Sequence, residues 1–186
     1  TNVSFPMNDT HESLISMYIN GKLQDVVYMS DGSWDLDYDS TKTVVESYSI
    51  TNDTARNFAD TYPVFRDVQF KAKTDSYISA YKLLRGAAAM QDLTEYKTMS
   101  FKAKGEGASL KITLVKYSIT NFAKQFSYVL PIGKELKDYT INLSDFTGED
   151  PLEKINANDI TTVVFAFENT TGISTTIDAA IADIFF

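Results

Sequence analysis

The composition of this 186-residue chain is that of a soluble globular protein with few residues of the types that often carry catalysis, since it has no cysteine and one histidine. Its length suits one well-buried domain. It is 44% hydrophobic and 23% charged, and its longest apolar runs are far too short to cross a bilayer. The net charge of −8 repels phosphate backbones and anionic lipid surfaces, so nucleic acid is excluded as an expected partner. Because the chain has no cysteine, disulfides and thiolate chemistry are also excluded.

The first acidic segment of the chain, residues 35–46, has two interpretations. Its acids occupy positions one, three, five and twelve, as in a calcium-binding loop, although Ser40 replaces the glycine of the sharp turn. The same residues also fit an edge strand that turns Trp34, Leu36 and Tyr38 inward and leaves the aspartates in solvent, where they discourage aggregation. Both interpretations stay open from the sequence.

The rest of the first half gives three further elements. Residues 43–50 predict a strand, and the polar residues 51–63 predict a long loop or a short helix. Residues 75–85 alternate in a way that leaves both strand faces partly apolar. One interpretation of this strand turns Tyr77 and Tyr81 outward.

The second half predicts about six short strands at roughly even spacing, as in an antiparallel sandwich. Residues 96–103 alternate and stop at a glycine turn, and residues 110–117 and 125–132 are expected to pair as a hairpin. Further strands are predicted at residues 139–143, 162–168 and 177–186. The predicted fold class is all-β, an antiparallel β-sandwich that forms one domain over residues 1–186.

Three sequence motifs in the second half carry a family resemblance. They read QDLTEYKTMSFKAKGEG at residues 91–107, KDYTINLSDF at 137–146 and IADI at 181–184. In order and spacing they resemble elements of galactose-binding-like jelly rolls, nearest among them the family 11 carbohydrate-binding modules and the domain of the thirty-kilodalton complex I intermediate-associated protein. Two residues depart from the pattern: Tyr139 stands where tryptophan is usual, and Ala182 replaces the first aspartate of the closing pair.

The resemblance implies a structural calcium between the first and last strands. Pro6 and Ala182 stand where acids would help to hold it, which leaves Asp183 as the candidate metal ligand. It also implies a bacterial secreted or cell-surface setting, in which this domain is excised from a larger glycoside hydrolase or surface protein. We therefore expect appended catalytic or surface domains, no membrane span and a monomer.

A glycan site needs exposed aromatic planes flanked by hydrogen-bonding groups. The strand at residues 75–85 places two tyrosines and an arginine on one face, and neighbouring strands add aromatic and basic side chains. The alternative is that these side chains pack inside the second sheet. The only tryptophan fits a stacking platform on a loop and a core position equally well. The candidate ligand-binding residues are Trp34, Tyr77, Tyr81, Arg85, Lys111, Tyr117 and Tyr128.

No residue is assigned to catalysis. His11, the single histidine, lacks a second histidine for a metal site and a serine in a nucleophile context, and nothing singles out a carboxylate pair. The resulting hypothesis is a non-catalytic carbohydrate-binding module that binds a polysaccharide, with a β-glucan favoured by the resemblance, through exposed aromatic residues on a concave sheet. The alternative is a structural or protein-interaction domain of a multidomain surface protein. A small polysaccharide lyase or hydrolase is the third hypothesis.

Overall fold

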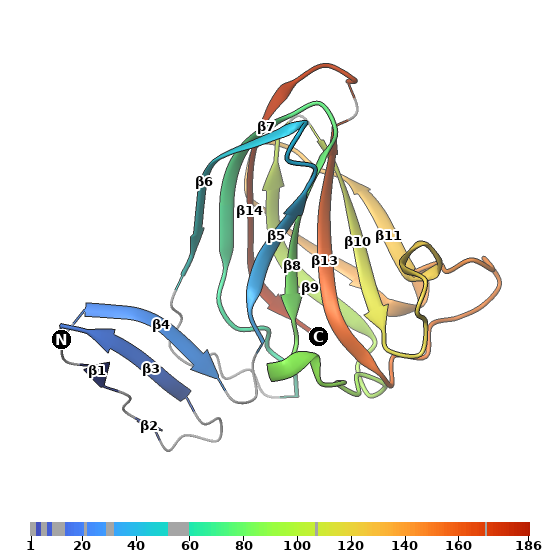
Figure 1. The fold of residues 1–186 in the computed structure, drawn as a ribbon. Helices are drawn as coiled ribbons and strands as arrows, with labels where there is room; N and C mark the ends of the chain where they lie inside the picture. The colour runs from blue at the N-terminus through green and yellow to red at the C-terminus, as the bar shows by residue number, and fades with distance from the viewer. Residues whose placement is uncertain are drawn as a thin grey trace.

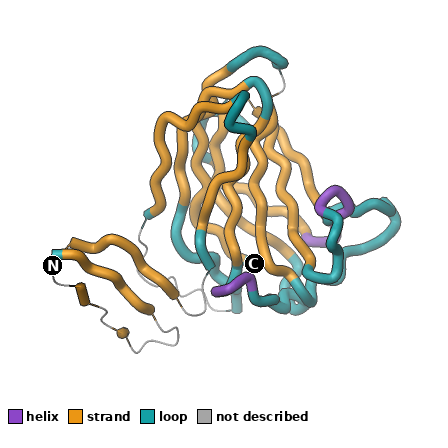
Figure 2. Tube along the Cα trace, viewed as in Figure 1, coloured by secondary structure: helices purple, strands orange, loops and turns teal. Residues whose placement is uncertain are grey.

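The computed structural model of the chain consists almost entirely of antiparallel β-strands (Figures 1 and 2). It describes residues 3–4, 7–8, 14–20, 22–28, 32–51, 60–106, 108–169 and 171–186. Helical structure within these residues is confined to short 3-10 turns: η1 (Gly86–Ala88), η2 (Phe122–Lys124) and η3 (Leu143–Asp145). None of the described helices has the length and apolarity needed to cross a membrane.

Two five-stranded antiparallel sheets form the sandwich, and we name each after its central strand. The β13 sheet has the order β11-β10-β13-β8-β5, and the β14 sheet has the order β12-β9-β14-β7-β6. The β13 sheet contains β5 (Trp34–Tyr38), β8 (Tyr77–Leu83), β10 (Ala108–Lys116), β11 (Phe126–Pro131) and β13 (Ile160–Asn169). The β14 sheet contains β6 (Thr43–Ile50), β7 (Val68–Thr74), β9 (Thr98–Gly105), β12 (Lys137–Asn142) and β14 (Thr175–Phe185).

The chain passes repeatedly from one sheet to the other, so that β5 and β6, β7 and β8, β9 and β10, β11 and β12, and β13 and β14 all lie in opposite sheets. Figure 1 shows the two layers face to face, with loops joining the strands at both ends of the sandwich. This crossing pattern is that of a jelly roll. The predicted fold class, an antiparallel β-sandwich of the jelly-roll type, is confirmed.

A separate sheet is formed by β1 (Val3–Ser4), β2 (Met7–Asn8), β3 (Leu14–Ile19) and β4 (Lys22–Tyr28). Strand β3 pairs with each of the other three. Its hairpin with β4 turns at Asn20, whose φ of 51° is a conformation that asparagine adopts more readily than most residues. The family resemblance implied a first strand near the position of β1, but β2, β3 and β4 were not predicted.

The core lies between the sandwich sheets and is organised around the aromatic rings of β13. The ring of Phe165 lies 5.9 Å from that of Phe101 and 6.1 Å from that of Trp34, measured between centroids. Phe167 meets Phe70 edge to face at 5.4 Å. These distances fall within the range in which aromatic pairs attract one another beyond the gain from burial. The contacts join β5 and β13 of one sheet to β7 and β9 of the other.

Most predicted strands are confirmed by the structure. The second-half segments correspond to β9, to the β10–β11 hairpin and to β12, β13 and β14, and residues 43–50 correspond to β6. Strand β7 was not predicted, although its burial alternates along all seven residues. Of the loop predicted at residues 51–63, residues 52–59 lie outside the described part of the chain, as does His11.

A buried ion pair anchors the segment that precedes β13. The ammonium group of Lys116, at the end of β10, donates to the Asp159 carboxylate and to the carbonyl of Asn156, and Asp159 also accepts the backbone N–H of Ser118 at 2.8 Å. The side chains of Lys116 and Asp159 are only 9% and 12% exposed. A buried charge that loses its partner is costly, so this pair fixes the path of the chain into the sheet.

We expect Asp159→Asn to lower the free energy of unfolding by about 3–5 kcal/mol, because it leaves the buried Lys116 ammonium without a counter-charge. Asp178→Asn is the matched control, since it removes an exposed ion pair with Lys104 and should cost less than about 1 kcal/mol. Urea unfolding of both variants measures the difference, and equal losses would contradict the anchoring role.

The same pair predicts the response to acid. Burial raises the pKa of the Asp159 carboxyl, but hydrogen bonds from Lys116 and Ser118 outweigh it and leave the pKa below the usual 3.8. A lowered folded-state pKa contributes stability that is complete above the unfolded value and is lost as the pH falls through the folded one. The stability difference between the parent protein and Asp159→Asn should therefore shrink below pH 3.8.

Gly105 marks a place where the two sheets approach too closely for a side chain. A Cβ atom added there would lie 2.5 Å from Cε1 of the Phe167 ring, whereas one added at Gly133 would meet no atom within 4 Å. We expect Gly105→Ala to destabilise the fold by about 1–3 kcal/mol through overpacking. Thermal unfolding of Gly105→Ala and of the control Gly133→Ala tests this, and similar melting temperatures for the two variants would count against it.

Candidate functional site

The outer face of the β13 sheet is hollowed into a groove of about 540 Å³. Its walls and floor come from β5, β8, β10 and β13 and from the loop that carries η2. The lining residues are Asp37, Tyr77, Ser79, Tyr81, Lys111, Thr113, Val115, Phe122, Thr162, Val164, Ala166 and Glu168. All but Phe122 are outward-facing members of strands, which follows from the alternation of side chains between the two faces of a sheet.

The floor of the groove is low because short side chains meet there in register. Ser79 on β8 lies opposite Ala166 on β13, which in turn lies opposite Lys111 on β10. The adjacent outward-facing row runs from Tyr81 through Val164 to Thr113. The long side chains thus stand at the borders while small ones occupy the middle, and a hollow results.

One wall of the groove consists of two tyrosines held by aspartates. The hydroxyls of Tyr77 and Tyr81 donate to the carboxylates of Asp37 and Asp35 on the neighbouring edge strand, each at 3.3 Å. Burial and then the nearby carboxylate raise the pKa of each phenol above its usual 10.0. Both rings are therefore neutral hydrogen-bond donors at physiological pH, and their positions are constrained by a second strand.

Phe122 lines the groove from a loop rather than from a strand, and its side chain is 57% exposed. The Asn121 side chain accepts the backbone N–H of Ala123 at 3.0 Å and so caps the 3-10 turn that carries the phenylalanine. The buried Gln125 closes the loop, because its amide donates to the carbonyl of Ile119 at 2.6 Å and accepts the N–H of Lys116 at 2.8 Å. An aromatic ring is thus held at the solvent-exposed border of the groove.

The groove combines exposed ring surfaces with groups that donate and accept hydrogen bonds. Lys111 supplies an ammonium donor, Asp37 and Glu168 supply carboxylate acceptors, and Ser79 and Thr113 supply hydroxyls that do either. Such a surface can bind a molecule that has apolar faces and a rim of hydroxyls. Tyr77, Tyr81 and Lys111 are the predicted site residues that the structure brings together here.

Trp34 belongs to the core, so its assignment as a loop-borne platform is corrected. It is 4% exposed, and its indole Nε1–H donates to the backbone carbonyl of Arg66 at 3.1 Å. The first residue of β5 faces inward, towards Phe165, which places the tryptophan on the side of the sheet opposite to the groove. Burial removes its apolar ring from water, and the Arg66 carbonyl satisfies its single N–H donor.

Three other predicted residues also lie away from the groove lining. Tyr128 turns towards the inner layer, where its ring lies 5.9 Å from that of Phe146. Arg85 lies beyond the end of β8 and donates to the carbonyl of Met90 at 3.4 Å. Tyr117, 69% exposed, follows the last residue of β10. Tyr128 therefore faces the interior and not the groove. Arg85 and Tyr117 lie outside the strands that were predicted to include them, because β8 ends at Leu83 and β10 ends at Lys116.

Calcium at the two predicted positions stays a prediction, because Pro6 lies outside the described residues. Calcium takes six to eight oxygen ligands, and in this structure the Asp183 carboxylate pairs with the Lys102 ammonium at 2.9 Å. In the segment 35–46, two aspartates lie on β5, and Asp39 accepts hydrogen bonds from Thr41 at the following turn. No group of three or more potential metal ligands occurs in the parts of the chain that the structure describes.

Several solved structures resemble this chain. The family 11 carbohydrate-binding module of the cellulosomal cellulase Lic26A-Cel5E of Clostridium thermocellum is 15% identical, with a TM-score of 0.52 over 100% of this chain and 95% of that one. The solution structure of CtCBM11 is 14% identical, with a TM-score of 0.50 over 82% of this chain and 86% of that one. No protein-family model and no curated protein sequence matches. At this identity the likeness shows a shared fold, and the predicted resemblance to family 11 modules is confirmed at that level.

Proposed function

We propose that this chain is a non-catalytic carbohydrate-binding module whose ligand is a polysaccharide lying in the groove of the β13 sheet. The observation that carries the proposal is the groove itself, bordered by the rings of Tyr77, Tyr81 and Phe122 and lined by polar groups of both kinds. Support comes from the fold, which is shared with a family 11 carbohydrate-binding module of a cellulase.

The proposed recognition combines stacking with hydrogen bonding. The C–H faces of a sugar pack on the aromatic rings, while its hydroxyls bond to Lys111, to Glu168 and to the hydroxyls of the floor. The contacts from Tyr77 and Tyr81 to the aspartates hold both rings before the ligand arrives. Little side-chain freedom is then lost on binding, which favours affinity because immobilising each side chain opposes association.

A neutral polymer suits the charges of the groove better than an acidic one. Asp37 and Glu168 line the groove with a single cation, Lys111, and Asp35 lies directly behind the Tyr81 hydroxyl. A carboxylated or sulfated chain would meet like charges at short range, which disfavours binding. We therefore propose a neutral polysaccharide, and the resemblance to family 11 modules favours a β-glucan among the candidates.

The proposal includes a larger parent protein. Weak binding by one groove is useful when the module is attached to another domain, because the attachment raises the effective concentration of that domain near the polymer. We propose a secreted or cell-surface glycoside hydrolase or surface protein of a bacterium as this parent. The module itself would act as a monomer.

Removal of one wall ring tests the groove. We expect Tyr81→Ala to weaken retention in a gel that contains a soluble β-glucan by about fivefold to tenfold, the equivalent of about 1 kcal/mol for one aromatic contact. Tyr117→Ala is the matched control, because this tyrosine is exposed and lies outside the groove lining. Unchanged retention of Tyr81→Ala, with an unchanged melting temperature, would exclude the groove as the binding surface.

The opposite wall gives an independent prediction. Phe122→Ala should reduce affinity for the same glucan by a similar factor of about fivefold, since it removes an exposed ring that supports no buried structure. Isothermal titration with the glucan measures the change. If Phe122→Ala binds as the parent does while Tyr81→Ala does not, the ligand contacts the tyrosine wall alone.

Incubation of the parent protein with the polymer should release no reducing ends, and their accumulation would contradict the non-catalytic assignment.

A further inference from the structure

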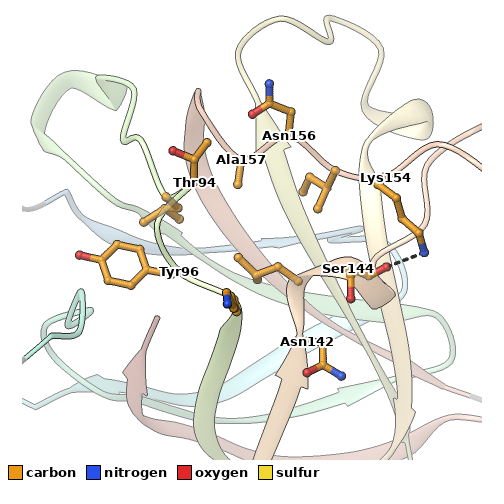
Figure 3. A pocket seen from close by; sticks show the side chains of 11 residues that line it. Thr94, Tyr96, Asn142, Ser144, Lys154, Asn156 and Ala157 are labelled. Carbon is orange, nitrogen blue, oxygen red and sulfur yellow. Dashed lines mark hydrogen bonds between the residues drawn. The ribbon is translucent and has the colours of Figure 1, made fainter.

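A second cavity, of about 550 Å³, lies where three chain segments meet, at residues 93–97, 142–144 and 154–157 (Figure 3). It shares no lining residue with the groove of the β13 sheet. Figure 3 shows Lys154 and Ser144 joined on one side of the cavity, Asn142 below it and Asn156 above it. The cavity is therefore a separate feature of the fold that the proposed function does not use.

Backbone hydrogen bonds hold the three segments together. The N–H of Leu93 donates to the carbonyl of Ala157, and the N–H of Leu143 donates to the carbonyl of Lys97, each at 2.8 Å. The carbonyl of Asn156 accepts from the buried Lys116 ammonium that also pairs with Asp159. Because each wall is attached to another wall or to the core, the cavity is formed before any ligand enters.

The floor of the cavity is apolar and its rim is polar. Leu93, Leu143 and Ala157 are buried at its base. The rim carries hydroxyl, phenol and amide groups and two ammonium groups, supplied by Thr94, Tyr96, Lys97, Asn142, Ser144, Lys154 and Asn156. No carboxylate lines the cavity, although the chain as a whole has a net charge of −8. The lining residues themselves thus carry two positive charges and no negative one, which favours an anionic ligand.

Two of the neighbouring acids, Asp92 and Asp145, accept local hydrogen bonds, and Glu95 and Glu153 also adjoin the lining in sequence. Asp92 accepts both the backbone N–H and the hydroxyl of Thr94, at 2.9 and 2.7 Å. Asp145 accepts from the side-chain amide of Asn142 at 2.9 Å, which leaves the amide oxygen of that asparagine to accept from a ligand. Lys154 donates one of its three ammonium protons to the carbonyl of Ser144 at 3.1 Å, and two remain for a ligand.

We propose that this cavity binds a carboxylated sugar, such as a uronic acid unit. The ligand carboxylate would pair with the ammonium groups of Lys97 and Lys154, and its ring hydroxyls would bond to Asn142 and Asn156. Its apolar face would lie on the leucine floor. Charge-assisted bonds to a carboxylate are stronger than neutral ones, so the acid group supplies the selectivity over a neutral sugar. This inference does not depend on the groove.

The test is an NMR titration of the full chain with methyl glucuronide, methyl glucoside and acetate. We expect methyl glucuronide alone to give saturable shifts of backbone amides at residues 93–97, 142–144 and 154–157. Lys154→Gln and Lys97→Gln should each weaken the binding by about tenfold, the loss expected for one hydrogen bond to a charged group. Both lysines are exposed, so the variants should keep the parent melting temperature.

Two controls separate this cavity from the groove and from general charge effects. Lys134→Gln removes an exposed lysine that lines neither cavity and should leave the binding of methyl glucuronide unchanged. Tyr81→Ala should also leave it unchanged, whatever its effect on glucan binding. Equal shifts with methyl glucoside would overturn the selectivity for an acid, equal shifts with acetate would reduce the site to a simple anion site, and the absence of saturable shifts would overturn the proposal.

Discussion

The packing of aromatic rings between the two sheets is the interaction on which the rest of this structure depends. Phe165 contacts rings from both layers, and Phe167 meets Phe70 across the interior. Because these rings must face inward, the period of two in β13 sends the intervening residues outward. The outer surface of the central strand, and with it the floor of the groove, is therefore determined by the same alternation that builds the core.

The groove and the second cavity arise from different parts of the architecture. The groove is a property of a sheet face, where side chains of unequal length stand in register, and its tyrosine wall is steadied by an edge strand. The second cavity is a property of loops, and it exists because backbone bonds and the Lys116–Asp159 pair hold three connections together. One chain thus offers an acidic aromatic surface and a basic polar one without overlap between them.

Much of the fold could be predicted from local alternation, and part of the site as well. The strands around Phe165 and Ile112, and the outward direction of Tyr77 and Tyr81, follow from the period of two. The alternation of β7 and the turn at Asn20 in the first hairpin were equally readable signals that the prediction did not use.

Other features depend on contacts that are distant in sequence. The edge-strand alternation turns Trp34 inward, but the Arg66 carbonyl that accepts its indole N–H lies 32 residues away, and no local pattern reveals that partner. The second cavity requires the joining of three separate segments. Such features follow from tertiary structure, which the period of two does not encode.

Ala166 and Glu168 lie on the outer face of β13, and the inner-face side chains of this strand are buried in the core. This arrangement has an evolutionary consequence. Replacing either side chain alters the contour and charge of the hollow without opening a void in the interior. Descendants of this chain could therefore change ligand by drift at a few outward positions while selection for folding acts on their neighbours. Sequence divergence at these positions should run ahead of divergence in the rest of the strand.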